Sequence, residues 1–152
     1  MFVYSLDLVL VRTIRWEKDG WGLAHNGTHL FASDGTSTIY VVDKDFQLQS
    51  KITVKENGRP VIYLNELEYY KGFLLANIYY QPNVVMINIT SGEVVAKYNA
   101  AALAIEEVEK HRLQGDEVLN GIAYDEKTNR LLLTGKNWGQ IYEIPTSPFD
   151  LK

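Results

Sequence analysis

One pattern of short apolar runs and polar turns occurs three times along the chain and limits the folds open to it. The three units span residues 20–54, 64–99 and 119–144. Each holds a run rich in Leu, Ile, Val and Tyr, a turn with Gly or Asn, a second such run and then a third. The first two units add a fourth run, at residues 48–54 and 93–98. Runs of this kind are typical of antiparallel strands joined by hairpins, so we expect three antiparallel sheets.

Repeated four-stranded units of this length are the signature of a β-propeller, in which sheets pack face to face around a central channel. Residues 2–16 have the pattern of the last two strands of an earlier unit, and the third unit has no fourth run. We therefore expect an all-β fold with a single partial propeller domain over residues 1–152, about three and a half blades. An unclosed ring exposes sheet edges and blade faces, so self-association is expected.

The stretch between the second and third units differs from the rest. Residues 99–113 read NAAALAIEEVEKHRL and are rich in Ala and Glu, which favour helix. We expect one short helix inserted between two blades, which accounts for the longer spacing there.

Composition excludes several classes of function. The net charge is -4 and no cluster of Lys and Arg occurs, which argues against nucleic acid or an anionic membrane as partner. Without cysteine there is no disulfide, thiol nucleophile or cysteine-based zinc site. The histidines, at positions 25, 29 and 111, lack metal-ligand spacing, and residues 43–45 suit a hairpin turn better than a calcium loop. We therefore predict no metal ligands.

The N-terminal residues MFVYSLD carry an acid and a strand-like alternation instead of a basic segment followed by a long apolar run. The sequence therefore predicts no signal peptide and no membrane span in this chain, and its compartment stays open.

Each unit carries polar or aromatic residues at the start of its first strand and after its second. They are Trp21, Ser33 and Asp34; Asn65, Glu66, Asn77 and Tyr79; and Asn120, Lys136, Asn137 and Trp138. In a propeller both positions can meet at one end of the channel. A pocket there would have aromatic walls, amide hydrogen bonds and one positive charge, lined by Trp21, Asn65, Tyr79, Lys136 and Trp138.

These residues also have simpler interpretations. Both Trp21 and Trp138 suit packing between blades, and the two asparagines, at positions 65 and 120, suit strand ends. Taken alone, Lys136 suits a solvated loop, and the alternating glutamates at positions 66 and 68 suit a solvent-facing pair. The residues by themselves support a partial propeller with a candidate pocket at one end.

Four stretches carry a resemblance to a known family. They are FVYSLD at residues 2–7, DGWGLAHNGTHLFASDGTSTIYVVD at 19–43, LNELEYYKGFLLANIYY at 64–80 and VLNGIAYDEKTNRLLLTGKNWGQIYEI at 118–144. Together they are similar to the plant and bacterial type of glutaminyl-peptide cyclotransferase, a five-bladed β-propeller. The resemblance implies conversion of the N-terminal glutamine of a peptide or protein to pyroglutamate, with release of ammonia.

The resemblance also implies roles for the candidate pocket. In GWGL, Trp21 would wall the pocket around the glutamine side chain, with Tyr79 and Trp138 as further binding residues. In LNELEY, Asn65 would hydrogen-bond the substrate or the developing tetrahedral centre, and in TGKNW, Lys136 would contribute charge. Position 79 is Tyr where the family usually has Trp. No organic cofactor is expected, and a structural ion in the channel is compatible with the family's fold.

Two motifs of the family do not occur in these 152 residues: Phe-x-Gln-Gly and Phe-Gly-Glu-Gly, whose Glu is expected to act as general acid and base. The chain is therefore expected to be N-terminally truncated relative to the family. Loss of a general acid or base typically costs about 10²- to 10⁴-fold in rate, so the isolated chain is expected to show negligible cyclisation. The alternatives are a non-catalytic binding or interaction module and a generic sugar- or peptide-binding propeller.

Overall fold

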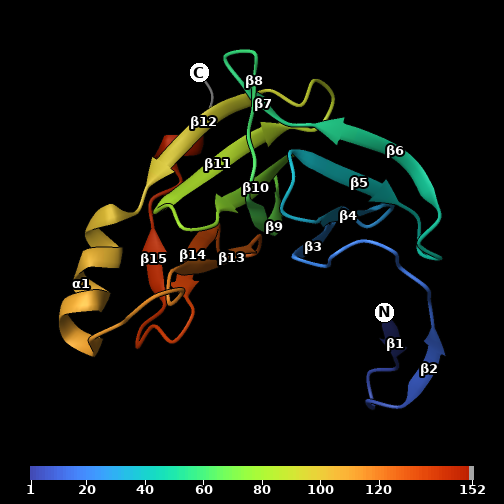
Figure 1. The fold of residues 1–152 in the computed structure, drawn as a ribbon, viewed down its shortest axis with the longest axis horizontal. Helices are drawn as coiled ribbons and strands as arrows, with labels where there is room; N and C mark the ends of the chain where they lie inside the picture. Colours follow the sequence, from blue (N-terminus) through green and yellow to red (C-terminus); the bar gives the residue numbers. More distant parts are fainter. Residues whose placement is uncertain (151–152) are drawn as a thin grey trace.

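The computed structural model describes residues 1–150, and antiparallel strands dominate it (Figure 1). The first four-stranded sheet has the order β3-β4-β5-β6, the second β9-β10-β11-β12. A third sheet has the order β13-β14-β15, and two small hairpins are formed by β1 with β2 and by β7 with β8. The bounds are β1 Phe2–Tyr4, β2 Leu10–Thr13, β3 Gly22–His25, β4 Leu30–Ser33, β5 Thr38–Val42, β6 Leu48–Thr53, β7 Lys55–Glu56, β8 Arg59–Pro60, β9 Leu64–Tyr70, β10 Phe73–Ile78, β11 Asn83–Asn88, β12 Val94–Asn99, β13 Leu119–Asp125, β14 Arg130–Gly135 and β15 Tyr142–Ile144.

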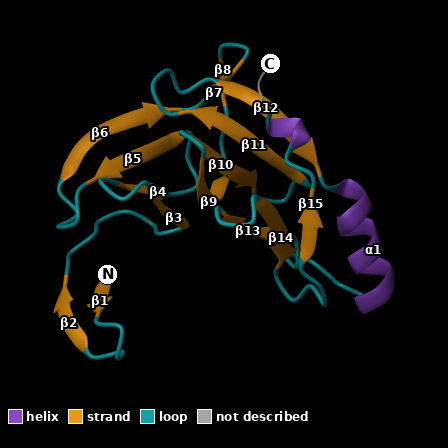
Figure 2. Ribbon diagram, turned by 180° about the vertical axis from the view of Figure 1, so that it is seen from behind, coloured by secondary structure: helices purple, strands orange, loops and turns teal. Residues whose placement is uncertain are grey.

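The three larger sheets follow one another around an arc, with their first strands β3, β9 and β13 on its inner side (Figures 1 and 2). The β1–β2 hairpin lies at one end of the arc and β15 at the other. Within residues 1–150 the sheets form no closed ring. The fold is a partial β-propeller, as the repeats predict.

Strict alternation along the middle strands of the second sheet builds the core. From β10, Leu74 and Ala76 pack toward the first sheet, whereas Leu75 packs toward the third. On β11, Val85 faces the first sheet and Val84 the third. Because successive side chains of a strand point to opposite faces, the second sheet is apolar on both faces and is packed between its neighbours.

The outer face of the first sheet is covered only in part. A small cluster around Ala32, Tyr40 and Val42 is packed by Trp16 from the segment before β3. The Trp16 ring meets the Tyr40 ring edge-on at 5.7 Å. The nearby β1–β2 hairpin leaves Leu6 and other large apolar side chains exposed.

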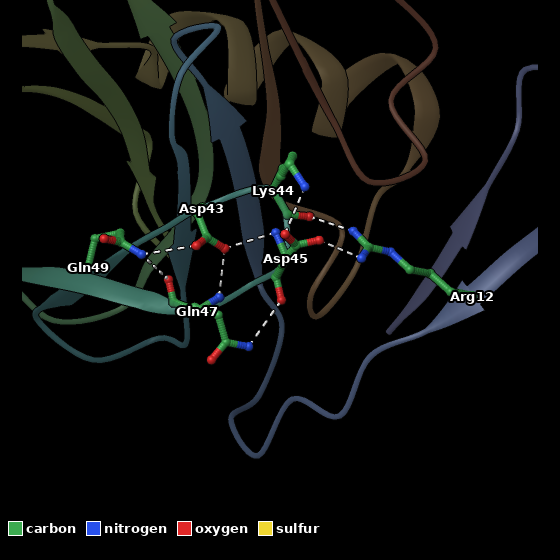
Figure 3. Close-up of polar contacts among 6 residues, drawn as sticks. All are labelled: Arg12, Asp43, Lys44, Asp45, Gln47 and Gln49. Carbon is green, nitrogen blue, oxygen red and sulfur yellow. Dashed lines mark hydrogen bonds and ion pairs between the residues drawn. The ribbon is translucent and has the colours of Figure 1, made fainter.

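An ion pair attaches this hairpin to the turn between β5 and β6 (Figure 3). The Arg12 guanidinium donates to Asp45 Oδ1 at 2.5 Å and to the carbonyl oxygen of Lys44 at 2.8 Å. The turn itself is closed by Asp43, whose Oδ1 accepts the backbone N–H groups of Asp45 and Gln47 at 2.8 and 2.9 Å. The carboxylate of Asp43 therefore stabilises a turn.

The helix α1, Ala101–His111, follows β12 and lies beside β15 (Figures 1 and 2). Arg112 caps its C-terminal end: the residue has a left-handed backbone (φ 54°), and its N–H donates to the carbonyl of Val108. A short 3₁₀ helix, η1 (Ser147–Phe149), lies against β12 and places Phe149 in the core cluster that the second and third sheets share. Within residues 1–150, no helix has the length and apolar character needed to cross a membrane.

The first two sheets approach most closely at Gly22. A Cβ atom added there would lie 2.0 Å from the carbonyl oxygen of Asn65, so only glycine fits between β3 and β9. We predict that Gly22→Ala lowers the free energy of unfolding by about 1–3 kcal/mol, the usual cost of overpacking. Thermal unfolding followed by circular dichroism measures the change.

The matched control is Gly20→Ala, because nothing lies within 4 Å of a Cβ atom added at Gly20. This variant should unfold close to the unaltered chain. Equal melting temperatures for both variants would contradict close packing between β3 and β9.

Candidate active site

Residues from all three larger sheets meet in one pocket at the end of the inner strands where β9 begins. The pocket has a volume of about 300 Å³ and is lined by Gly20, Trp21, Asn65, Tyr79, Asn120 and Lys136. The structure thus brings together four of the five residues proposed from the sequence, and it adds Gly20 and Asn120.

The cation of the pocket is Lys136, which follows β14. Its Nζ donates a hydrogen bond to Tyr79 Oη at 2.9 Å and lies 3.9 Å from Asp116 Oδ2. The hydrogen bond to Tyr79, with the nearby negative charge of Asp116, raises the pKa of Lys136 above its ordinary value. The ammonium group therefore stays protonated at neutral pH and acts as a donor and positive charge, and it is not a base.

Two aromatic rings form the wall of the pocket. The rings of Trp21 and Tyr79 meet edge-on at 5.5 Å. Behind Trp21 lies Gly35, where an added Cβ atom would be 2.7 Å from Cζ2 of the indole. The backbone N–H of Tyr79 donates to the carbonyl oxygen of Tyr63 at 2.8 Å. The indole of Trp21 is therefore packed against Gly35, and the backbone that carries the Tyr79 ring is fixed by its bond to Tyr63.

A pair of amides forms the polar side. Asn65 Nδ2 donates to Asn120 Oδ1 at 2.8 Å, which joins the starts of β9 and β13. The backbone of Asn65 is fixed in turn by Ser33, whose hydroxyl donates to its carbonyl oxygen at 2.7 Å. This bond leaves Asn65 Oδ1 and Asn120 Nδ2 without a hydrogen-bond partner among residues 1–150. The pair can offer a bound molecule both an acceptor and a donor.

Two further residues considered for the pocket have structural roles. Both Ser33 and Asn77 are fully buried. The pairing of β9 with β10 shifts register between Ala76 and Ile78, so Asn77 has no partner in that ladder. Its side chain replaces the missing bonds: Oδ1 accepts the N–H of Glu66 at 2.8 Å, and Nδ2 donates to the carbonyl of Leu119 at 2.7 Å.

The structure does not place Trp138 in the lining of this pocket. Its ring packs over Gly135, with an added Cβ there only 2.3 Å from the indole, and meets the ring of Tyr142 edge-on at 6.0 Å. The indole Nε1 donates to the carbonyl of Glu117 at 3.4 Å. Sequence spacing alone did not reveal this, because the loop reverses direction at Asn137, which has φ 57°.

A larger cavity of about 550 Å³ adjoins the pocket at Gly20 and Trp21 and includes Glu66 in its lining. Burial, together with the charge of Glu68, raises the pKa of Glu66 above its ordinary value. The sequence favoured a solvent-facing position for Glu66 and Glu68. The alternation of the strand does not reveal that Glu66 is half-buried. Residues 1–150 contain no group of three or more His, Asp and Glu side chains that could hold a metal ion.

A partial β-propeller with a pocket of aromatic, amide and ammonium groups at one end of its inner strands defines a class of protein. Comparison with known proteins identifies the family. Residues 1–146 match the model of a family described as glutamine cyclotransferase. The chain is 41% identical over 146 residues to the glutaminyl-peptide cyclotransferase of Arabidopsis thaliana. The chain belongs to the glutamine cyclotransferase family.

Solved structures agree with this assignment. The glutaminyl cyclase of Myxococcus xanthus superposes with a TM-score of 0.86 at 34% identity, over 93% of this chain. A streptogramin B lyase shares the fold alone, with a TM-score of 0.54 at 12% identity. The chain spans 45% of the length of the Arabidopsis relative and 61% of the Myxococcus chain.

The raised pKa of Glu66 predicts how stability changes with pH. Because folding favours the protonated carboxyl, the ionised carboxylate destabilises the fold above the folded-state pKa, and this penalty disappears as pH falls toward the ordinary value of 4.5. We expect Glu66→Gln to raise the melting temperature at pH 7 to 8 and to change it little near pH 4. The exposed Glu109 supplies the control, and a Glu109→Gln variant with the same pH dependence would refute the assignment.

Proposed function

We propose that the chain forms part of the active site of a glutaminyl-peptide cyclotransferase, which converts the N-terminal glutamine of a peptide or protein to pyroglutamate and releases ammonia. One observation carries the proposal: a single pocket unites the Lys136 ammonium, the Asn65–Asn120 amide pair and the Trp21–Tyr79 wall. Membership of the glutamine cyclotransferase family supports it.

The reaction sets three chemical requirements. The neutral α-amine attacks the carbonyl carbon of its own side-chain amide, so the C–N bond of the ring forms and the carbonyl oxygen becomes negative. The attacking α-amine loses one proton, and the leaving nitrogen gains one. The C–N bond to that nitrogen then breaks, and ammonia departs. A site for this reaction must hold the side chain folded, stabilise the oxyanion and transfer a proton.

The pocket residues suit the first two requirements. The protonated Lys136 can place its charge and a hydrogen bond on the oxyanion, which is worth most in a site shielded from water. The carbonyl of Asn65 can accept from the α-amine or from the departing amide nitrogen, because that oxygen is not used by Asn120. The edges of Trp21 and Tyr79 can enclose the methylene groups of glutamine.

In this proposal Trp138 supports the loop that carries Lys136 and does not touch the substrate. Its indole is anchored to the carbonyl of Glu117 and covers Gly135, the residue before Lys136. Proton transfer is assigned to the glutamate of the family's Phe-Gly-Glu-Gly motif, which these 152 residues do not contain. The 152-residue chain alone should therefore bind an N-terminal glutamine and turn it over negligibly.

The binding prediction is tested with a short peptide that begins with glutamine. The peptide is titrated into the protein, and binding is followed by tryptophan fluorescence or calorimetry. Lys136→Met should weaken its affinity by about 10- to 100-fold, the range for a lost hydrogen bond to a charged group. The control is Lys127→Met, in the exposed turn between β13 and β14. Equal affinity for the same peptide with an acetylated N-terminus, or no effect of Lys136→Met, would exclude this pocket as the binding site.

The same samples are assayed for ammonia release and, by mass spectrometry, for pyroglutamate. Negligible turnover with retained binding is the expected result. Robust turnover that depends on Lys136 would support the cyclotransferase reaction and show that proton transfer does not need the missing motif.

A second candidate function, an interaction module, is favoured by the open ends of the arc. Within residues 1–150, β15 pairs with β14 alone, and the β1–β2 hairpin exposes Leu6, Leu8 and Val9. Unpaired strand edges and exposed apolar side chains promote association with a further chain. We propose that the isolated chain associates with copies of itself through these ends.

Sedimentation velocity over a range of concentrations tests this proposal. The expected result is a sedimentation coefficient that rises with concentration, and Leu8→Glu should reduce the rise. A single monomeric boundary at every concentration, together with a cooperative melt, would contradict it.

A further inference from the structure

One carboxylate outside the pocket is buried without an apparent need. Among residues 1–150, Glu107 of α1 is the only charged side chain that is fully buried, with an exposed fraction of 0%. Its Oε2 accepts the backbone N–H of Gly139 at 2.7 Å, and its Oε1 accepts the hydroxyl of Tyr142 at 2.6 Å. A buried charge is costly unless such bonds compensate it. An apolar residue could pack the helix against the core without this cost, so packing alone does not account for Glu107.

The charge state of this contact is well defined. Burial alone would raise the pKa of Glu107, but the hydrogen bonds from Tyr142 and Gly139 lower it below its ordinary value. Burial and the bond to Glu107 raise the pKa of Tyr142 to about 12. At neutral pH an ionised acceptor therefore meets two protonated donors, which makes both bonds short and strong.

Close packing accompanies these bonds. A Cβ atom added at Gly139 would lie 2.3 Å from Nε2 of His111, so the last turn of α1 lies directly against the loop. The same His111 atom is 3.6 Å from Glu107 Oε2. The helix therefore contacts Gly139 in two ways: Glu107 accepts its N–H, and the His111 ring packs against it.

The opposite side of the loop is fixed by the segment before β13. The backbone N–H of Lys136 donates to the carbonyl of Val118 at 3.0 Å. The side-chain amide of Asn137 donates to Glu117 Oε1 at 2.7 Å. Residues 136–139 are thus held at both ends, and Lys136 extends between these anchors toward Tyr79 in the pocket.

We propose that Glu107 is a positioning residue for Lys136: by fixing the backbone of Gly139 and the ring of Tyr142, it holds the loop at the one place where the ammonium reaches the pocket. The assignment of a catalytic purpose to this position rests on the proposed function. In this proposal the inserted helix α1 contributes to the site, because it supports the loop of Lys136 from the outer side of the third sheet.

The test compares four variants with the unaltered chain. Glu107→Gln keeps the shape but removes the charge, and Tyr142→Phe removes one of the two bonds and keeps the ring. Glu106→Gln alters the neighbouring, partly exposed carboxylate that pairs with Lys110. Leu103→Ala removes an apolar contact of the same helix with the core and serves as the control for loss of stability alone.

The first measurement is the rate at which an amine-specific reagent modifies Lys136, resolved by peptide mass spectrometry well below the melting temperature. Glu107→Gln should speed this modification about tenfold, with a smaller increase for Tyr142→Phe and none for Glu106→Gln or Leu103→Ala. The second is the affinity for the glutamine-initiated peptide, which should weaken about tenfold in Glu107→Gln.

Two outcomes would overturn the proposal. One is an unchanged modification rate in both Glu107→Gln and Tyr142→Phe. The other is a rise in Leu103→Ala as large as that in Glu107→Gln, which would make the effect one of general stability. If the unaltered chain does not bind the peptide, the proposed function fails, while the modification rates still decide whether Glu107 positions Lys136.

Discussion

The contact between the inner strands is the constraint on which the rest of the structure depends. Where β3 meets β9, the absence of a side chain at Gly22 lets the carbonyl of Asn65 approach, and the hydroxyl of Ser33 bonds that same oxygen. Where the second sheet meets the third, Asn77 of β10 donates a hydrogen bond to the carbonyl of Leu119 at the start of β13. These buried polar bonds fix how each sheet sits against the next, which apolar contacts alone do with less specificity.

The location of the pocket follows from the same contacts. Three sheets that diverge from a shared inner edge leave a hollow where their inner strands begin, and each contributes the residues nearest that end. For β9 this residue is Asn65, and for β13 it is Asn120. Their hydrogen bond joins the second and third sheets at the pocket. The amides at the pocket therefore lie on strands that are joined by buried hydrogen bonds, which suits a site that must be preorganised.

Sequence reasoning reached the fold class because strands and turns leave strong local patterns, and family motifs then pointed to Trp21 and Lys136. It was less informative wherever the deciding contact is distant in sequence. The bulge that buries Asn77 and the reversal at Asn137 that turns Trp138 away from the pocket depend on register and backbone conformation. Likewise, Glu107 reads as an ordinary helix charge, because its partners lie 32 and 35 residues further along the chain.

The buried carboxylate of Glu107 bonds to the loop that carries Lys136 and to the strand after it. A hydrophobic contact such as that of Leu103 suffices to seat α1 on the core, yet the helix also buries a carboxylate, and the partners of that carboxylate lie in and just after the loop that carries Lys136. Since a lysine side chain has many rotamers, the ammonium keeps a defined position only if its backbone is fixed and its end is bonded. The bonds of Val118 and Glu107 supply the first condition and Tyr79 the second. The flexible side chain thereby becomes a fixed charge at the pocket.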